Sequence, residues 1–219
     1  MAVTIEDIKK LRAMTGAGMK DCKKALAEAD GDIDKAVELV RERGLAIAAK
    51  RSDRVTSNGC VLVKNVNGFA ASVALKCETD FVANGADYVQ LTQDILDAAI
   101  AAKAKTLEEV LELEVEPGLK VAEAVQRRSG VVGEKMELDG YQVLEGENIY
   151  TYDHMGRHTL TTMVQLSEAN EDAGHKVAMQ VAAMKPVALN ESEVPQEVKD
   201  SELKIAIEKT KEEDRKRHV

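Results

Sequence analysis

Aromatic residues are scarce in this chain of 219 residues: they make up 3%, with no tryptophan, two phenylalanines and four tyrosines. Proteins that hold single-stranded nucleic acid stack its bases on aromatic side chains, and here there is almost no material for such a platform. The chain also lacks an excess of positive charge, since 30 Lys and Arg face 39 Asp and Glu for a net charge of −9. This sign is wrong for a phosphate backbone, so we expect no direct contact with nucleic acid.

Cysteines are few as well, and Cys22, Cys60 and Cys77 form no CxxC spacing. An odd number of cysteines without a signal peptide argues against a disulfide framework and favours the reduced cytoplasm. We interpret Cys22 as a small apolar residue on a helix stripe, and the other two as strand residues.

Long hydrophobic runs are missing. Every apolar stretch is far shorter than the roughly 20 residues that span a bilayer, and no signal-type segment opens the chain. We therefore expect no membrane anchor. Because 44% of the residues are hydrophobic, the chain can still build a core of one large domain or two smaller ones.

Catalytic and cofactor motifs are also absent: the sequence contains no Walker phosphate loop, no GxSxG elbow and no Rossmann fingerprint. Gly16-Ala17-Gly18 lies between predicted helices instead of after a strand. The chain is therefore predicted not to be an enzyme and to carry no cofactor.

Two histidines, His154 and His158, have a spacing that on a helix would present two metal ligands on one face. The surrounding alternation and Gly156 indicate a strand and turn instead, and no third ligand is nearby in a suitable pattern. We interpret both as solvent-exposed turn residues and predict no metal site.

The first 54 residues differ from the rest in charge, with 12 basic and 10 acidic residues against 18 and 29 afterwards. Thr4 can cap a helix together with Asp7, and apolar residues repeat at helical spacing. Three short helices are predicted, ending at Gly16-Ala17-Gly18, Asp30-Gly31 and Gly44. Residues 1–54 are therefore predicted to be a small helical module that presents a binding surface.

The pattern then changes to strands. Residues 60–66 and 69–75 are rich in β-forming residues and flank Asn67-Gly68, which suits a tight hairpin turn. Helices are predicted from Asp87 to Ile100, from Leu107 to Leu113 and from Leu119 to Arg128, with Pro117-Gly118 ending the first two. These elements make residues 55–135 a first core subdomain.

Strand character returns after residue 135. Residues 136–138, 141–144, 149–152 and 160–166 are predicted to form a second, smaller sheet, with Asp139-Gly140 between the first two. A helix is predicted at 172–184, ending at Lys185-Pro186, and a last helix opens at Pro195. Residues 136–194 would form a second, incomplete subdomain and residues 195–219 the start of a helical arm, so the fold class is α+β.

The segment Thr79-Asp80-Phe81-Val82 follows the hairpin and carries one of the two phenylalanines beside an acid. From the residues alone, the favoured interpretation is that Phe81 packs into the core and Asp80 caps the following turn.

Two motifs resemble those of a known family. Leu11-Arg12, Thr15–Met19 and Asp21–Leu26 resemble the N-terminal signature of bacterial elongation factor Ts, and Glu78–Asn84 resembles its second signature. The resemblance covers essentially the whole chain and is loosest after residue 135.

The resemblance implies a guanine-nucleotide exchange factor that binds elongation factor Tu, the GTPase of translation elongation, and lowers its affinity for GDP and magnesium. It also implies an N-terminal three-helix bundle of the ubiquitin-associated type, followed by small antiparallel sheets with packed helices. The family carries a coiled-coil helical arm, within whose first helix this chain ends, so we expect a truncated arm. A homodimer formed through this arm is an alternative that the sequence leaves open.

The resemblance also assigns partner-binding residues. Lys20 departs from a second Met that is frequent in the family, and His158 and Thr159 replace its usual apolar-Gly continuation. The residues that match are Arg12, Met19, Asp80, Phe81, Val132, Gly133, His154 and Arg157.

Two other function classes remain as alternatives. A helical adaptor would use the N-terminal bundle to bind another protein without any exchange activity. A small hydrolase would need a nucleophile and a base that the sequence does not bring together.

Overall fold

The structure is a computed structural model that describes residues 3–217. It is an α+β protein with helices at the N-terminus and small antiparallel sheets, as the sequence predicts. The chain divides after Ala182 into two compact units, and each unit is described by itself.

Three helices open the first unit: α1 (Ile5–Thr15), α2 (Met19–Glu28) and α3 (Ile33–Ala49). The predicted capping box is confirmed, because Thr4 Oγ1 accepts the Asp7 N–H at 3.1 Å and Asp7 Oδ2 accepts the Thr4 N–H at 3.1 Å. Helix α1 ends where Gly16 adopts a left-handed φ of 70°. The three helices enclose a small core of their own, which includes Leu11, Cys22, Ala25, Leu26 and Ala36.

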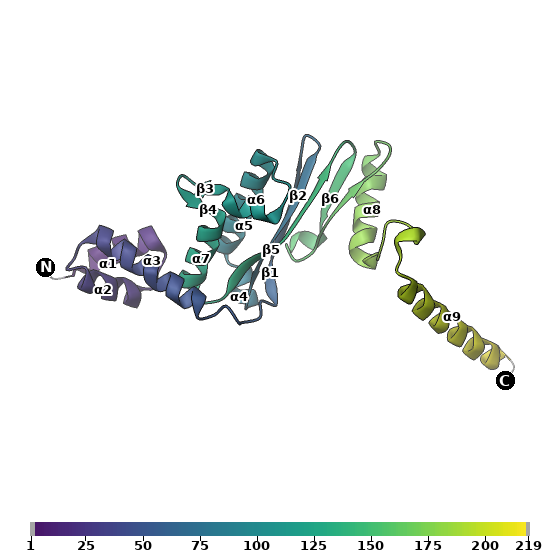
Figure 1. The fold of residues 1–219 in the computed structure, drawn as a ribbon, viewed down its shortest axis with the longest axis horizontal. Helices are drawn as coiled ribbons and strands as arrows, with labels where there is room; N and C mark the ends of the chain where they lie inside the picture. Colours follow the sequence, from purple (N-terminus) through teal and green to yellow (C-terminus); the bar gives the residue numbers. More distant parts are fainter. Residues whose placement is uncertain (1–2, 218–219) are drawn as a thin grey trace. The chain divides into compact units, whose positions relative to one another are not determined.

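Helix α3 does not end at Gly44, so this part of the sequence prediction is wrong. Gly44 is buried and lies against Gly130 of helix α7 (Val121–Val132). A Cβ added at Gly130 would lie only 2.2 Å from the Gly44 Cα. Gly44 therefore permits a close helix crossing instead of stopping a helix, and Figure 1 shows α7 beside the C-terminal half of α3.

A three-stranded antiparallel sheet forms the centre of this unit. Its strands β1 (Asn58–Val66), β2 (Phe69–Cys77) and β5 (Met136–Glu145) lie in the order β1-β2-β5. The predicted hairpin turn is confirmed, since Asn67 and Gly68 both have positive φ, 50° and 80°.

Strand β5 corrects the predicted second sheet. Residues 136–144 belong to one continuous strand that pairs with β2, from Met136 opposite Cys77 to Glu145 opposite Phe69. Asp139-Gly140 is an irregularity within that strand, where the register shifts between Ala74 and Leu75. A turn and a bulge use the same residue types, so the dipeptide alone did not distinguish them.

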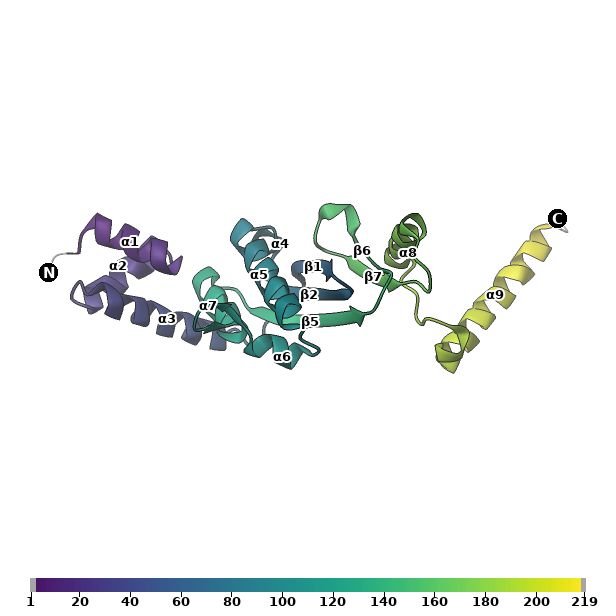
Figure 2. The same cartoon turned by 90° about the horizontal axis from the view of Figure 1, so that it is seen from above.

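Helices cover one face of the sheet. Helix α5 (Ala86–Ala102) packs on β1 and β2 (Figure 2), and the short helices α4 (Asp80–Ala83) and α6 (Leu107–Glu112) flank it in the chain. The main core lies between these layers and includes Val73, Leu75, Tyr88, Ile95 and Leu96.

A small hairpin lies where the sequence predicted the end of one helix and the start of the next. Strands β3 (Glu114–Glu116) and β4 (Leu119–Lys120) pair around Pro117-Gly118, so α7 starts at Val121 and not at Leu119. Strands of two or three residues leave too little alternation to be recognised in a sequence.

The two later strands of the predicted second sheet do form a small sheet of their own. Strand β6 (Ile149–Asp153) pairs with β7 (Thr161–Gln165), and a single helical turn, η1 (His154–Gly156), starts the connection. Helix α8 (Glu171–Met184) packs on this hairpin, because Gly174 lies on the Tyr150 ring and Thr162 Oγ1 donates to the Ala178 carbonyl at 2.8 Å.

The second unit contains the short turn η2 (Glu191–Glu193) and helix α9 (Gln196–Arg217), which follows Pro195 as predicted. Over residues 3–217, no helix combines the length and the apolar character that crossing a membrane requires.

Candidate partner-binding site

Phe81 projects from helix α4 with 88% of its surface exposed. The other side of this four-residue helix faces the core, since Ala83 is buried and Val82 packs against the main hydrophobic cluster. The core interpretation of Phe81 is therefore wrong, and the structure leaves this large apolar side chain in solvent.

Asp80 is exposed and is the first residue of α4. The interpretation of Asp80 as the cap is also wrong, because the residue at the cap position is Thr79. The Asp80 carbonyl closes the helix instead, accepting the Asn84 N–H at 3.0 Å and Asn84 Nδ2 at 2.8 Å. The Asp80 side chain thus stands free of any capping role beside Phe81.

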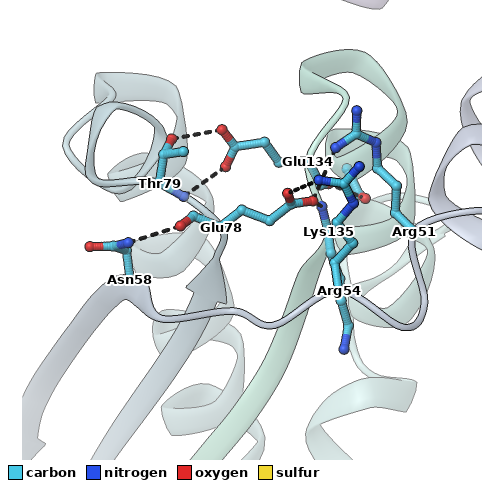
Figure 3. Close-up of polar contacts among 8 residues, drawn as sticks. Arg51, Arg54, Asn58, Glu78, Thr79, Glu134 and Lys135 are labelled. Carbon is cyan, nitrogen blue, oxygen red and sulfur yellow. Dashed lines mark hydrogen bonds and ion pairs between the residues drawn. The ribbon is translucent and has the colours of Figure 1, made fainter.

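The side chain of Thr79 bonds Glu134 and does not cap its own helix (Figure 3). The Thr79 N–H donates to Glu134 Oε2 at 3.0 Å and the Thr79 hydroxyl donates to Glu134 Oε1 at 2.6 Å. Gly133 makes this approach possible by ending α7 with a left-handed φ of 78°. The pair Val132-Gly133 is thereby placed next to the segment that carries Asp80 and Phe81.

Glu78 collects a second set of donors at the same junction (Figure 3). Its Oε1 accepts the Lys135 N–H at 2.7 Å and Arg51 Nη1 at 3.1 Å, its Oε2 accepts Arg54 Nη1 at 3.4 Å, and its carbonyl accepts Asn58 Nδ2 at 2.9 Å. The Lys135 N–H, together with the two guanidinium groups, lowers the pKa of Glu78. The side chain is 14% exposed and is held as a carboxylate.

His154 and Arg157 lie in the turn between β6 and β7, and both are exposed. The turn interpretation of the two histidines is confirmed by the positive φ of Met155 and His158, 58° and 56°. His158 is only half-exposed, however, and its ring bonds Asp153. Among the described side chains, no group of three or more His, Cys, Asp or Glu is placed to hold a metal ion.

This turn lies at the same end of the sheet as α4. The His158 carbonyl accepts the Val61 N–H at 2.6 Å, and Val61 is three residues from Asn58, which faces Cys77 at the end of β2. Met136, at the start of β5, faces Cys77 from the other side. Three of the predicted pairs thus gather at one end of the sheet.

Arg12 and Met19 come from the N-terminal helices, and both are exposed. Gly16 lies between them, and a Cβ added there would lie 3.6 Å from Val131 Cγ1. The loop between α1 and α2 therefore rests on the C-terminal turn of α7, beside Val132. The predicted residues from all four parts of the sequence belong to one compact unit.

The residues that brace α4 were not found from the sequence. Glu78 lies within the second motif, but its partners Arg51 and Arg54 lie at the charge boundary, and Glu134 lies 55 residues from Thr79. Glutamates and arginines are usually solvated, so nothing in the local pattern distinguishes this set.

Fold and site together describe an α+β protein that presents a large apolar side chain, Phe81, to solvent. The model of the family "Elongation factor TS" matches residues 78–219. The chain belongs to the elongation factor Ts family.

Relatives from several bacteria carry the name elongation factor Ts. The protein of Bacteroides fragilis is 61% identical over 212 residues, which cover 96% of this chain and 64% of the relative. That of Parabacteroides distasonis is 57% identical over 211 residues with the same two coverages. That of Porphyromonas gingivalis is 50% identical over 210 residues, 95% of this chain and 76% of the relative. The chain thus spans less than two thirds of the length of the first two relatives and about three quarters of the third.

Proposed function

We propose that this chain is a guanine-nucleotide exchange factor that binds elongation factor Tu and promotes GDP release during translation elongation. The observation that carries the proposal is the exposed Phe81 beside Asp80 on a braced helix, within a motif of the elongation factor Ts family. The relatives' name supports the same activity. The proposed activity makes and breaks no covalent bond.

An exchange factor must bind the nucleotide-deficient conformation of the GTPase more tightly than the GDP-bound one. The weakening of GDP binding then equals the weakening of factor binding by GDP, because the coupling is reciprocal. Contacts that exist in only one of the two conformations carry this coupling.

Phe81 is proposed to supply such a contact by filling a pocket between helices of the GTPase. Burying this side chain is worth about 1.5–3 kcal/mol. Asp80 would disturb the polar groups that hold the magnesium ion of the GTPase, and the diphosphate would lose its largest local counter-charge.

The remaining residues are proposed to widen the contact around this pair. The N-terminal helices would form a bundle of the ubiquitin-associated type, with Met19 as an adaptable apolar contact. The further proposed contacts are Arg12, Val132, Gly133, His154 and Arg157. We propose no direct nucleic-acid contact, and a homodimer through the helical arm remains open.

The test measures release of a fluorescent GDP analogue from elongation factor Tu. Phe81→Ala should slow release about tenfold or more, since about 1.4 kcal/mol corresponds to a factor of ten. Its melting temperature should be nearly unaltered, because the side chain is 88% exposed. Leu189→Ala is the matched control, since Leu189 is 94% exposed and has no proposed contact.

Asp80→Ala extends the same experiment. It should slow release too, with a smaller loss at low magnesium, where its proposed target is already depleted. The double variant should lose less than the sum of the two single losses, because both residues act on one partner conformation.

Two outcomes would contradict the proposal. A folded Phe81→Ala protein that releases GDP at the native rate would remove the proposed role of this side chain. A native chain that binds another protein without accelerating GDP release would favour the helical adaptor.

A further inference from the structure

The junction between β2 and α4 is held by two carboxylates that the proposed partner contacts do not include. Glu134 accepts both polar hydrogens of Thr79, and Glu78 accepts the Lys135 N–H and the two guanidinium groups (Figure 3). These bonds fix the two residues that directly precede Asp80 and Phe81.

Helix α4 cannot fix its own direction. It has four residues, far below the length at which an isolated helix is stable. Its cap residue, Thr79, makes no side-chain cap bond, because the hydroxyl points to Glu134 instead. The Thr79 carbonyl still accepts the first helical bond, from the Ala83 N–H at 3.2 Å, so the orientation of Thr79 sets that of the helix.

Glu134 is itself anchored. Its carbonyl accepts the hydroxyl of Ser129 at 2.5 Å, and Ser129 is 2% exposed near the end of α7. Bonds to an ionised carboxylate are about twice as strong as bonds between neutral groups. The pair Thr79–Glu134 therefore ties α4 to the end of a long, packed helix.

Glu78 connects the same junction to the segment after α3. The guanidinium groups of Arg51 and Arg54 bond Glu78 from that segment, and the backbone N–H of Lys135 bonds it from just before β5. The carboxylate is mostly enclosed, at 14% exposure, where screening by water is weaker than at the surface. Three chain segments far apart in sequence thus meet at the base of α4.

We infer that Glu134 and Glu78 are positioning residues that fix the direction in which the Phe81 side chain points into solvent. The inference rests on the proposed exchange function and adds residues that touch neither GTPase nor nucleotide. A side chain that acts by filling a pocket must be held within about 0.5 Å of its productive position. Without the hydrogen bonds of Glu134 and Glu78, helix α4 would have to regain its orientation in each encounter with the GTPase.

The experiment uses Thr79, because its hydroxyl can be removed without changing the shape of the side chain. Thr79→Val should lower the maximal rate of GDP release, at saturating factor, about tenfold or more, the effect of losing one hydrogen bond to a charged group. Thr79→Ser keeps the hydroxyl and should restore the rate to within about twofold. The rescue separates the hydrogen bond from the packing of the side chain.

The same substitution in a Phe81→Ala background gives a readout that a purely structural role would not produce. Thr79→Val should cause no further loss there, because no side chain remains to be positioned. A structural role predicts equal losses in both backgrounds, accompanied by a lower melting temperature.

Glu134→Met provides a second variant if Thr79→Val does not fold. It keeps roughly the length of the side chain but removes both carboxylate acceptors of Thr79, whereas a glutamine could still accept the N–H and donate to the hydroxyl. Glu134→Met should lower the maximal release rate to a similar degree and should likewise have no effect in the Phe81→Ala background.

The outcomes separate this inference from the proposed function. Native release rates in Thr79→Val and Glu134→Met, while Phe81→Ala is slow, would overturn the positioning role and leave the exchange function standing. A native chain that does not accelerate release at all would overturn the exchange function itself.

Discussion

Gly130 lies against the backbone of Gly44 where helices α3 and α7 cross. Within a helix, replacing glycine by alanine normally stabilises by about 0.5–1 kcal/mol. Here an added Cβ would lie 2.2 Å from the Gly44 Cα and 2.4 Å from its carbonyl carbon. Neither atom belongs to a flexible side chain, so the two helices would have to separate.

We expect Gly130→Ala to lower the free energy of unfolding by about 1–3 kcal/mol, the usual cost of overpacking. The control is Gln126→Ala, an exposed position on the same helix, where the substitution should change the free energy of unfolding by less than about 0.5 kcal/mol. Urea unfolding of both variants measures the difference. A Gly130→Ala protein more stable than the native one would show that the crossing is looser than described.

Single residues divide into those that a sequence can place and those that it cannot. The Thr4–Asp7 cap was predicted because both partners lie within one helical turn. Phe81 was assigned to the core from composition, since phenylalanines are usually buried, and only the family motif indicated otherwise. The bond from Thr79 to Glu134 joins residues 55 positions apart, so no local pattern contains it.

At the scale of elements, the sequence predicted the structures that neighbouring residues determine. The predictions were wrong where two elements that are distant in the sequence pack together. The hairpin of β1 and β2 follows from Asn67-Gly68 between two β-rich runs. Strand β5 was divided and given to another sheet, because its partner β2 lies about sixty residues earlier. Gly44 was taken as a helix end, because a glycine that stops a helix and one that admits a neighbour look alike in sequence.

The junction that joins β2, α7 and β5 should respond to acid through Glu78. The pKa of Glu78 is lowered from 4.5 in the folded protein, so folding favours the charged form. Its contribution is fully present above pH 4.5 and is lost as the pH falls through the folded pKa. Glu78→Gln should therefore lower the melting temperature at neutral pH and converge with the native protein in acid.

The control for this measurement is Glu108→Gln, an exposed position on α6. It should change the melting temperature little at either pH, as surface substitutions usually do. Parallel melting curves of the native and Glu78→Gln proteins, separated by the same amount from neutral to acid pH, would contradict the assigned role of the carboxylate.

At the scale of the whole molecule, the N-terminal helices and the sheet body have separate cores. The buried residues of the N-terminal core all lie before residue 41, and those of the core of the sheet body all lie after residue 59. The α+β class and the order of helices before sheets could be predicted, because periodicity and charge change along the chain. The division at residues 54, 135 and 194 stays a prediction.

Deleting residues 1–50 should leave the sheet body folded and weaken binding to elongation factor Tu. The deletion removes Arg12, Met19 and the Gly44 contact but keeps Arg51 and Arg54, which brace the base of α4. Circular dichroism would follow folding, and titration calorimetry would follow binding. Equal affinities of the shortened and intact chains would contradict a contact by the N-terminal helices.

The turn that carries His154 and Arg157 also covers the outer edge of β1. The His158 carbonyl accepts the Val61 N–H, a backbone donor of this edge, and the Ile149 carbonyl accepts the side-chain amide of Asn65. An uncovered edge strand offers free backbone groups to a strand of another molecule and is a site of aggregation. The turn proposed to meet the GTPase thus also covers part of the β1 edge and leaves fewer backbone groups there for a strand of another copy to pair with.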